Sequence, residues 1–242
     1  MDRDKEKDIQ LHKIPLRKNI SEAIYGAISK SVSVYIAKTS LTPNQITLIS
    51  GIFGVIGAIF LILQERLYLF LAGIFIQLYC ILDVVDGDIA RLKRMQSLFG
   101  KWLDNFFDKL NDLLLILGLS LGVYFQTREI YTLYLGTVLM GLIFFVQISI
   151  ISNSIILTKL EKEEKHTQQP NKTDRKNFGL VCISKEILKF IGKHLLLEHC
   201  TFLVLISFFA IINRLFIGLW FITIHAGLTL IFITATSLYK LR

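Results

Sequence analysis

The sequence predicts an all-α integral membrane protein, in which a bundle of six transmembrane helices follows an amphipathic helix at the membrane interface. Hydrophobic residues make up 53% of the 242 residues, the mean hydropathy is +0.56 and only 3 prolines occur. Soluble domains of this length rarely have such a composition. Six apolar stretches approach the roughly 20 residues that a spanning helix needs.

The chain is expected to divide into a charged cytoplasmic segment at residues 1–44 and a membrane domain at residues 45–242. Within the first segment, apolar residues of Ile20–Ala37 recur at helical spacing. We expect this helix to lie on the membrane surface, although a helix that is only solvated fits the pattern equally well. Thr42 and Pro43 then predict a helix start, with Thr42 as the N-cap and Pro43 at the first helical position.

The longest connection between the six predicted spans lies between the fourth and the fifth. The spans are Ile46–Leu63, Leu67–Val85, Trp102–Phe125, Ile130–Leu157, Leu195–Ile212 and Leu215–Leu238. The fifth is the weakest, because Glu198 and His199 interrupt it near its start. The long connection before it contains Lys159–Thr173, a mixed-charge run that we expect to be a solvated loop.

The distribution of basic residues explains the net charge of +8 by membrane topology rather than by nucleic-acid binding. Most Lys and Arg residues lie in the N-terminal segment, in the second-to-third and fourth-to-fifth connections, and in the C-terminal tail. The opposite side carries only Arg66, Arg128 and Arg214. By the positive-inside rule, both termini are expected on the cytoplasmic side.

Four carboxylates lie where two adjacent spans meet the cytoplasmic side. Asp83 and Asp86 end the second span, and Asp104 and Asp108 begin the third. Ionisable groups in a span are costly enough that a functional role is their default interpretation. Residues three or four apart share one helix face, so a hairpin of these spans can bring the two pairs together.

Four converging carboxylates repel one another at low dielectric unless cations lie among them. Oxygen ligands favour Mg²⁺ or Mn²⁺ over zinc, and no histidine is expected in this cluster. The alternative is that salt bridges to Arg91, Lys101 and Lys109 satisfy part of the charge. The five histidines show no metal-ligand spacing, and His225 in the sixth span is interpreted as an interhelical hydrogen-bonding residue.

Small and basic residues surround the aspartates. Gly87 and Gly100 let a backbone approach a ligand closely. Ala90 keeps the next turn small, and the guanidinium of Arg91 suits a phosphate. A diphosphate bound against the cytoplasmic ends of the spans would fit this combination.

The stretch from residue 83 to residue 108, DVVDGDIARLKRMQSLFGKWLDNFFD, matches the pattern D-x2-D-G-x2-A-R-x8-G-x3-D-x3-D at every fixed position. This pattern is the signature of the CDP-alcohol phosphatidyltransferases, and the chain resembles that family. The segment TPNQIT at residues 42–47 is also similar to the sequence with which many members enter their first span. The last part of the chain adds little to the resemblance.

The resemblance implies a six-span bundle with a cavity open to the cytoplasm, two divalent cations (Mg²⁺ or Mn²⁺), a CDP-linked lipid or alcohol donor, an alcohol acceptor and a homodimer. Asp83, Asp86 and Asp104 would be metal ligands, and Asp108 both a ligand and the general base. The CDP site would be lined by Asn44, Gly87, Ala90, Arg91 and Gly100. Asp112 lies outside the signature and is expected to be structural.

The substrates stay open at this point. The acceptor can be inositol phosphate, glycerol phosphate, serine or an amino alcohol, and the donor CDP-diacylglycerol, CDP-archaeol or a soluble CDP-alcohol. VDGDIAR and GKWLDNFFDK most resemble the inositol-phosphate branch, including di-inositol phosphate synthases, but the Arg-rich end of the fourth span expected there is missing. A divalent-cation transporter is the alternative from another class, although the Gly-Ala-Arg spacing favours a transferase.

Overall fold

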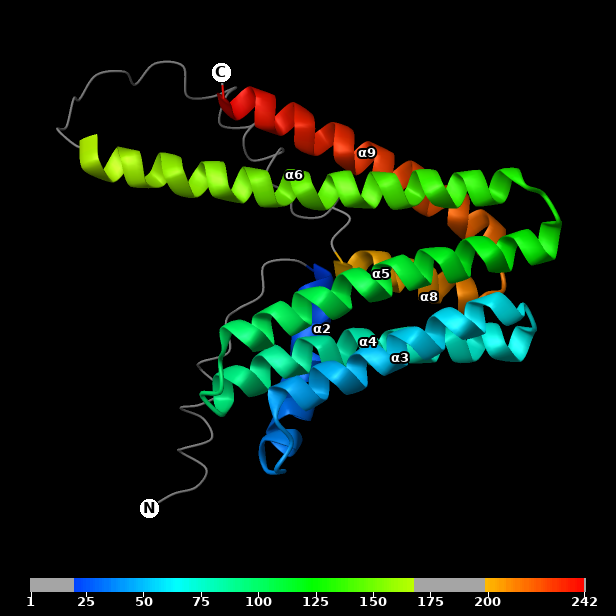
Figure 1. The fold of residues 1–242 in the computed structure, drawn as a ribbon, viewed down its shortest axis with the longest axis horizontal. Helices are drawn as coiled ribbons and strands as arrows, with labels where there is room; N and C mark the ends of the chain where they lie inside the picture. Colours follow the sequence, from blue (N-terminus) through cyan, green and yellow to red (C-terminus); the bar gives the residue numbers. More distant parts are fainter. Residues whose placement is uncertain (1–19, 168–198, 242) are drawn as a thin grey trace. The chain divides into compact units, whose positions relative to one another are not determined.

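The computed structural model describes residues 20–167 and 199–241, and every regular element among them is a helix (Figure 1). The helices are α2 (Ile20–Ala37), α3 (Pro43–Leu63), α4 (Arg66–Leu92), α5 (Leu98–Thr127), α6 (Tyr131–Thr167), α8 (His199–Ile211) and α9 (Leu215–Leu241). The all-α prediction is confirmed for these residues.

Four described segments are long and apolar enough to cross a membrane, namely Pro43–Leu63, Arg66–Leu92, Tyr131–Ser152 and Leu215–Ser237. Helix α5 carries several charged residues in its first half, and α8 has only 13 described residues. The protein is therefore an integral membrane protein with at least these apolar helices, and the count of six spans stays a prediction. The loop predicted at Lys159–Thr173 is wrong in its first part, because α6 continues as a helix to Thr167 through Glu and Lys residues that favour helix. The rest of that run lies outside the described residues.

The start of α3 follows the predicted capping chemistry. The Thr42 hydroxyl accepts a hydrogen bond from the Gln45 backbone N–H at 3.4 Å, and the Gln45 side chain accepts one from the Thr42 N–H at 2.9 Å. This reciprocal pair satisfies two backbone donors that a helix start leaves free. Pro43 occupies the first turn, where its missing N–H removes no helical bond.

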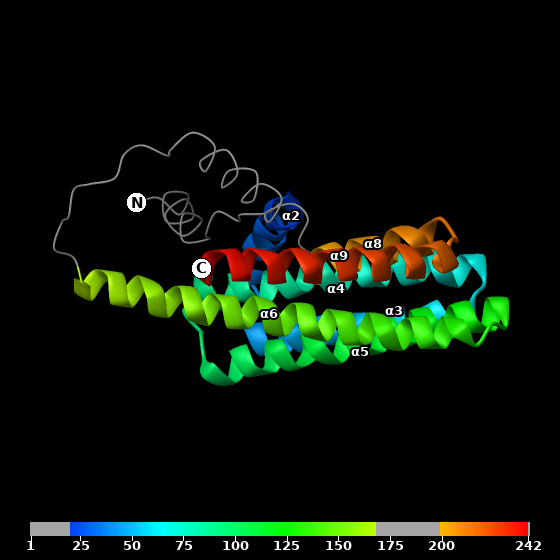
Figure 2. The same ribbon diagram turned by 90° about the horizontal axis from the view of Figure 1, so that it is seen from above.

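The chain forms two compact units. The first contains residues 1–137 and 198–222, and the second contains residues 138–197 and 223–242. In the first unit α3 packs against both α4 and α5, while α2 and α8 pack against α4. Figures 1 and 2 show α3, α4 and α5 running alongside one another, with α2 crossing them.

Helices α3 and α5 approach closely because glycines face the opposite backbone. A Cβ added at Gly118 would lie 2.5 Å from the Ala58 carbonyl oxygen, and one at Gly122 would clash with the Leu61 carbonyl. Small residues at such positions are the usual way in which membrane helices pack. This contact fixes α5 against α3, and α3 in turn holds α4, so the first unit has a rigid frame for the aspartates.

A small apolar cluster closes the end of the frame that carries the aspartates. Ile46, Val85 and Ile89 are buried there, and the partly buried residues packed against them include Val32 and Ile36 of α2. The helix predicted at Ile20–Ala37 therefore exists with these bounds and docks on the ends of α3 and α4. Its position on a membrane surface stays a prediction.

In the second unit, α9 carries His225. Its carbonyl oxygen accepts a 2.9 Å hydrogen bond from the Thr229 hydroxyl, one turn along the same helix. The predicted interhelical role of His225 is not tested by this contact.

Candidate active site

The two pairs of aspartates predicted to converge do so in the first unit. Ligand atoms of Asp83, Asp86 and Asp104 all lie within 4.8 Å of one another. A second set, formed by Asp83, Asp108 and His199, meets the same limit. Because Asp83 belongs to both sets, the four aspartates form one continuous cluster in which this residue is shared.

Asp86 is the most enclosed of the four, with 5% of its surface exposed. It accepts a hydrogen bond from the hydroxyl of Thr47, which lies on α3 just after its capped start. The capping pair at Thr42 and the aspartate at residue 86 are thus linked through the first two turns of α3. This link sets the orientation of the carboxylate that faces the cavity described below.

The cluster has the donor chemistry of a site for hard divalent cations. The two sets of three possible ligand atoms share one carboxylate, and carboxylate oxygens are the ligands that Mg²⁺ and Mn²⁺ accept most readily. Four carboxylates so close together need positive charge between them. The residues present therefore fit a divalent-cation centre.

Two of the cations proposed as salt-bridge partners are directed to other carboxylates. An Arg91 amino group lies 2.8 Å from Asp88, and the Lys109 ammonium lies 3.7 Å from Asp112. These ion pairs do not include the four aspartates of the cluster. The alternative in which Arg91, Lys101 and Lys109 satisfy part of the charge of the cluster stays a prediction.

A cavity of about 280 Å³ opens beside the aspartates. Its lining comes from the first turn of α3, the end of α4, the following turn and the start of α5. The lining residues are Pro43, Asn44, Thr47, Asp86, Gly87, Ala90, Arg91, Met95, Gln96, Ser97, Gly100, Lys101 and Asp104. All five residues predicted to contact CDP lie among them, together with two of the predicted metal ligands.

Gly100 has a local reason to be glycine. A Cβ there would lie 2.9 Å from the Asn44 side-chain oxygen and 3.1 Å from the Ser97 hydroxyl. Ser97 caps α5 by accepting a 2.9 Å hydrogen bond from the Gly100 N–H. The close approach lets Asn44 of α3 reach the start of α5, so one wall of the cavity closes at this point.

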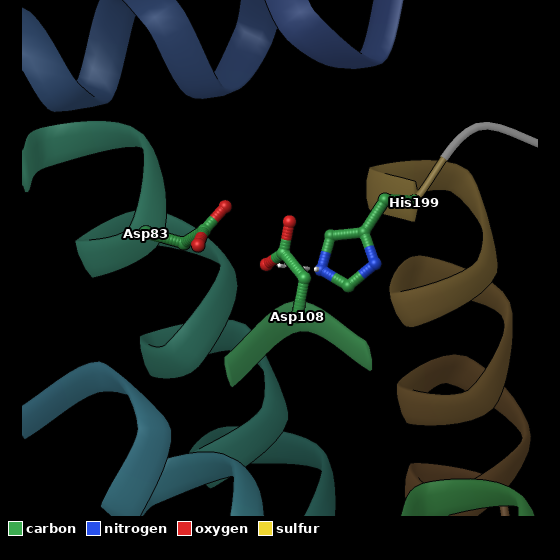
Figure 3. Close-up of side chains that lie close together, drawn as sticks. All are labelled: Asp83, Asp108 and His199. Carbon is green, nitrogen blue, oxygen red and sulfur yellow. Dashed lines mark ion pairs between the residues drawn. The ribbon is translucent and has the colours of Figure 1, made fainter. Parts of the chain in front are cut away.

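His199 is the residue that the sequence analysis missed. Figure 3 shows its ring extending from the first turn of α8 toward Asp108 of α5, with Asp83 of α4 beyond. The ring Nε2 lies 3.6 Å from Asp108 Oδ1 and 3.0 Å from the Tyr79 hydroxyl. The expectation that no histidine enters this cluster is wrong, because α8 packs on α4 and carries His199 to it.

The other ring nitrogen of His199 lies 3.0 Å from Asp112 Oδ1. Asp112 is thus an ion-pair partner of His199, and the structural role expected for it stays a prediction. Tyr79, fully buried, donates a 3.2 Å hydrogen bond to Asp108 Oδ1. A signal for His199 did exist in the sequence, since an ionisable side chain at the start of an apolar helix is costly without a polar partner.

The comparisons with known proteins fit this geometry. The family model described as CDP-alcohol phosphatidyltransferase matches residues 40–231, which include the cavity and the whole aspartate cluster. The chain belongs to this family. The prediction made from the signature is therefore confirmed.

Curated relatives in this family carry names from inositol-phosphate chemistry. An archaetidylinositol phosphate synthase from Pyrococcus horikoshii is 34% identical over 87 residues, which cover 36% of this chain and 45% of the relative. A phosphatidylinositol phosphate synthase from Corynebacterium glutamicum is 32% identical over 35% of this chain and 38% of its own length. A bifunctional IPC transferase and DIPP synthase from Thermococcus kodakarensis is 36% identical over 38% of this chain and 20% of its own length. In each case the match spans less than half of the relative.

Solved structures share the fold. Phosphatidylinositol phosphate synthase (PgsA1) from Mycobacterium tuberculosis with CDP-DAG bound aligns with a TM-score of 0.51 at 16% identity, over 85% of this chain and 90% of its own. The same protein in complex with manganese and citrate aligns with a TM-score of 0.54 at 15% identity, over 86% and 88% of the two chains. At this identity the likeness establishes the fold alone.

Proposed function

We propose that this protein transfers a phosphoalcohol group from a CDP-linked lipid to the hydroxyl of an inositol phosphate and releases CMP. The observation that carries the proposal is a single cavity that is lined both by the predicted CDP contacts and by Asp86 and Asp104 of the aspartate cluster. The names of the curated relatives favour an inositol phosphate acceptor. CDP-diacylglycerol and CDP-archaeol are the two donors to compare.

In this proposal the CDP part of the donor occupies the cavity. Asn44, Gly87, Ala90, Arg91 and Gly100 contact it, and the guanidinium of Arg91 faces the diphosphate. Asp83, Asp86, Asp104 and Asp108 would hold two divalent cations, Mg²⁺ or Mn²⁺. Cations bound there would supply neutralisation of the charge on the diphosphate and on departing CMP.

Asp108 is the proposed general base. It accepts the proton of the acceptor hydroxyl while the hydroxyl oxygen forms a bond to the donor phosphorus remote from cytidine. The bond from that phosphorus to the CMP oxygen breaks in the same in-line step, and CMP leaves. Tyr79 and His199 contact Asp108 on the side of α8 and hold its carboxylate in place.

The same proposal includes the arrangement in the membrane. Both termini and the cavity face the cytoplasm, residues 1–44 form a surface segment, residues 45–242 form the catalytic domain, and two chains form a homodimer. The basic residues beside the cavity, among them Lys93, Arg94 and Lys101, support the cytoplasmic assignment by the positive-inside rule. Di-inositol phosphate synthesis from a soluble CDP-alcohol is the second reaction to test, because several relatives are named bifunctional IPC transferase and DIPP synthase.

The test is CMP release by the purified protein in lipid nanodiscs with Mg²⁺. Each donor is offered with inositol phosphate, glycerol phosphate, serine or no acceptor, and the lipid product is identified by mass spectrometry. We expect acceptor-dependent CMP release with inositol phosphate. Cation uptake into liposomes without any CMP formation would support the transporter alternative and contradict this proposal.

Asp108→Asn separates binding from chemistry. The amide cannot accept the proton, so we expect a loss of turnover of at least about a hundredfold, with CDP binding largely retained because residue 108 does not line the cavity. Glu129→Gln, a similar change at the exposed turn after α5, serves as the control with normal activity. Near-normal rates in Asp108→Asn would refute the base assignment.

A further inference from the structure

A fifth aspartate, Asp88, lies between the cavity and the N-terminal helix α2. It is fully buried and belongs to neither set of cation ligands. One carboxylate oxygen, Oδ2, accepts a 2.8 Å hydrogen bond from the Ser29 hydroxyl of α2. The other, Oδ1, accepts a 2.8 Å hydrogen bond from an Arg91 amino group. A single buried carboxylate thus joins α2 to the arginine that lines the cavity.

The bond to Asp88 determines where the Arg91 guanidinium lies. A Cβ added at Gly87 would be 3.3 Å from an Arg91 amino nitrogen, so the guanidinium folds back over the small residue one turn earlier. Its Nε is buried and has no hydrogen-bond partner among the described residues. A free arginine side chain would have to lose rotamer entropy on binding a phosphate. Asp88 restrains it beforehand and leaves donors available for an anion.

Further polar contacts hold helix α2 against α4 on the face of α2 that carries Ser29. Tyr25, one turn earlier, donates a hydrogen bond to the Gln77 side chain of α4, and Gln77 donates one to Ser207 of α8. Burial raises the pKa of the Tyr25 phenol well above its usual range, so this group remains a neutral donor. Together with the apolar contact of Val32, these bonds fix α2 against α4 at the level of Asp88.

We propose that Asp88 is a positioning residue, which couples the docking of α2 to the orientation of Arg91 for the diphosphate of the donor. This inference rests on the proposed function, because it takes the cavity to be the CDP site. Helix α2 then contributes to donor affinity although the cavity lining comes from α3, α4, α5 and the turn between the last two. The coupling acts on donor binding and leaves the acceptor side, at Asp108 and His199, unaffected.

A double-mutant cycle tests the link between Asp88 and Arg91. We expect Asp88→Asn to raise KM for the CDP donor about tenfold, since the hydrogen bond from Arg91 loses its ionised acceptor, with kcat and the acceptor KM changed much less. Arg91→Ala should raise the donor KM at least as much. The double variant should resemble Arg91→Ala alone, because Asp88 acts only through that side chain. Additive effects of the two changes would overturn the proposal.

A milder pair of variants tests the link to α2. Ser29→Ala removes one hydrogen bond to Asp88 and should raise the donor KM about threefold. Ser33→Ala is the matched control, because Ser33 is an equally buried serine one turn along α2 whose hydroxyl has no hydrogen-bond partner among the described residues. It should leave the donor KM unchanged. Equal donor KM values in the two serine variants would overturn the proposal, even where Asp88→Asn fails to fold.

The outcomes distinguish this inference from the function on which it rests. Absence of CMP release by the wild-type protein with every donor would refute the proposed function. Normal wild-type activity together with an unchanged donor KM in folded Asp88→Asn would refute the positioning role alone. Thermal unfolding of each variant, followed in the same nanodiscs, shows whether it is folded.

Discussion

At the scale of single residues, Asp83 holds the central position in the aspartate cluster. It belongs to both sets of ligand atoms, whereas Asp86 and Asp104 belong to one set and Asp108 to the other. The four aspartates are therefore unequal, although the signature presents them as two equivalent pairs. Their separate contributions can be measured through cation binding, without any turnover.

We expect Asp83→Asn to weaken both of the proposed cation sites, because the shared carboxylate is lost from both. Asp104→Asn should weaken one site and Asp108→Asn the other, each by roughly tenfold or more, as expected when an ionised ligand becomes an amide. The measurement is a titration with Mn²⁺ followed by electron paramagnetic resonance, in which free Mn²⁺ is counted. A single site lost in Asp83→Asn, with the other at full affinity, would contradict the shared-ligand geometry.

His199 provides a second test at this scale. Its ring contacts Asp108, Asp112 and Tyr79, so His199→Ala leaves the proposed base without one of its neighbours. We expect kcat to fall roughly ten- to a hundredfold, in the range of supporting residues around metal sites, while the donor KM changes little. His225→Ala is the matched control, since this histidine lies on α9 in the other unit. Equal activities of the two variants would show that His199 does not support Asp108.

At the scale of helices, the close contact between α3 and α5 maintains the geometry of the site. In Gly118→Ala the new methyl group would meet the Ala58 backbone, which cannot move independently of α3. We expect a destabilisation of about 1–3 kcal/mol, as for overpacking in a core, measured by thermal unfolding in nanodiscs. Gly141→Ala is the control, because a Cβ at that position meets no atom within 4 Å. A Gly118→Ala protein as stable as this control would refute the tight contact.

The sequence was most informative where the signal is local. The helix at Ile20–Ala37 and the capped start of α3 at Thr42 follow from spacing and capping alone, and the aspartates converge because residues three or four apart share a helix face. The positions of His199 and Asp88 could not be predicted in this way. They depend on the docking of α8 and α2 against α4. These contacts join segments that are distant in the chain, so the helical spacing of residues within one segment does not predict them.

At the scale of the whole molecule, the membrane orientation is the prediction that determines where the substrates enter. The turn at Arg94 follows the end of α4 and borders the cavity, whereas Arg128 ends α5 at its far end. Both residues are exposed, and both have positive backbone φ angles, of 58° and 60°. They therefore form a matched pair on opposite ends of α5, and single cysteines at the two positions should report the two sides of the membrane.

In a variant without Cys80, Cys182 and Cys200, we expect Arg128→Cys in intact cells to react with a thiol reagent that cannot cross the membrane. Arg94→Cys should react only after the membrane is permeabilised, because the basic turn between α4 and α5 is retained on the cytoplasmic side. Because both positions are exposed and have similar φ angles, a difference in labelling reports the side of the membrane and not the local backbone. Labelling of Arg94→Cys alone in intact cells would invert the topology, and would place the cavity on the side of the membrane where a CDP donor made in the cytoplasm cannot reach it.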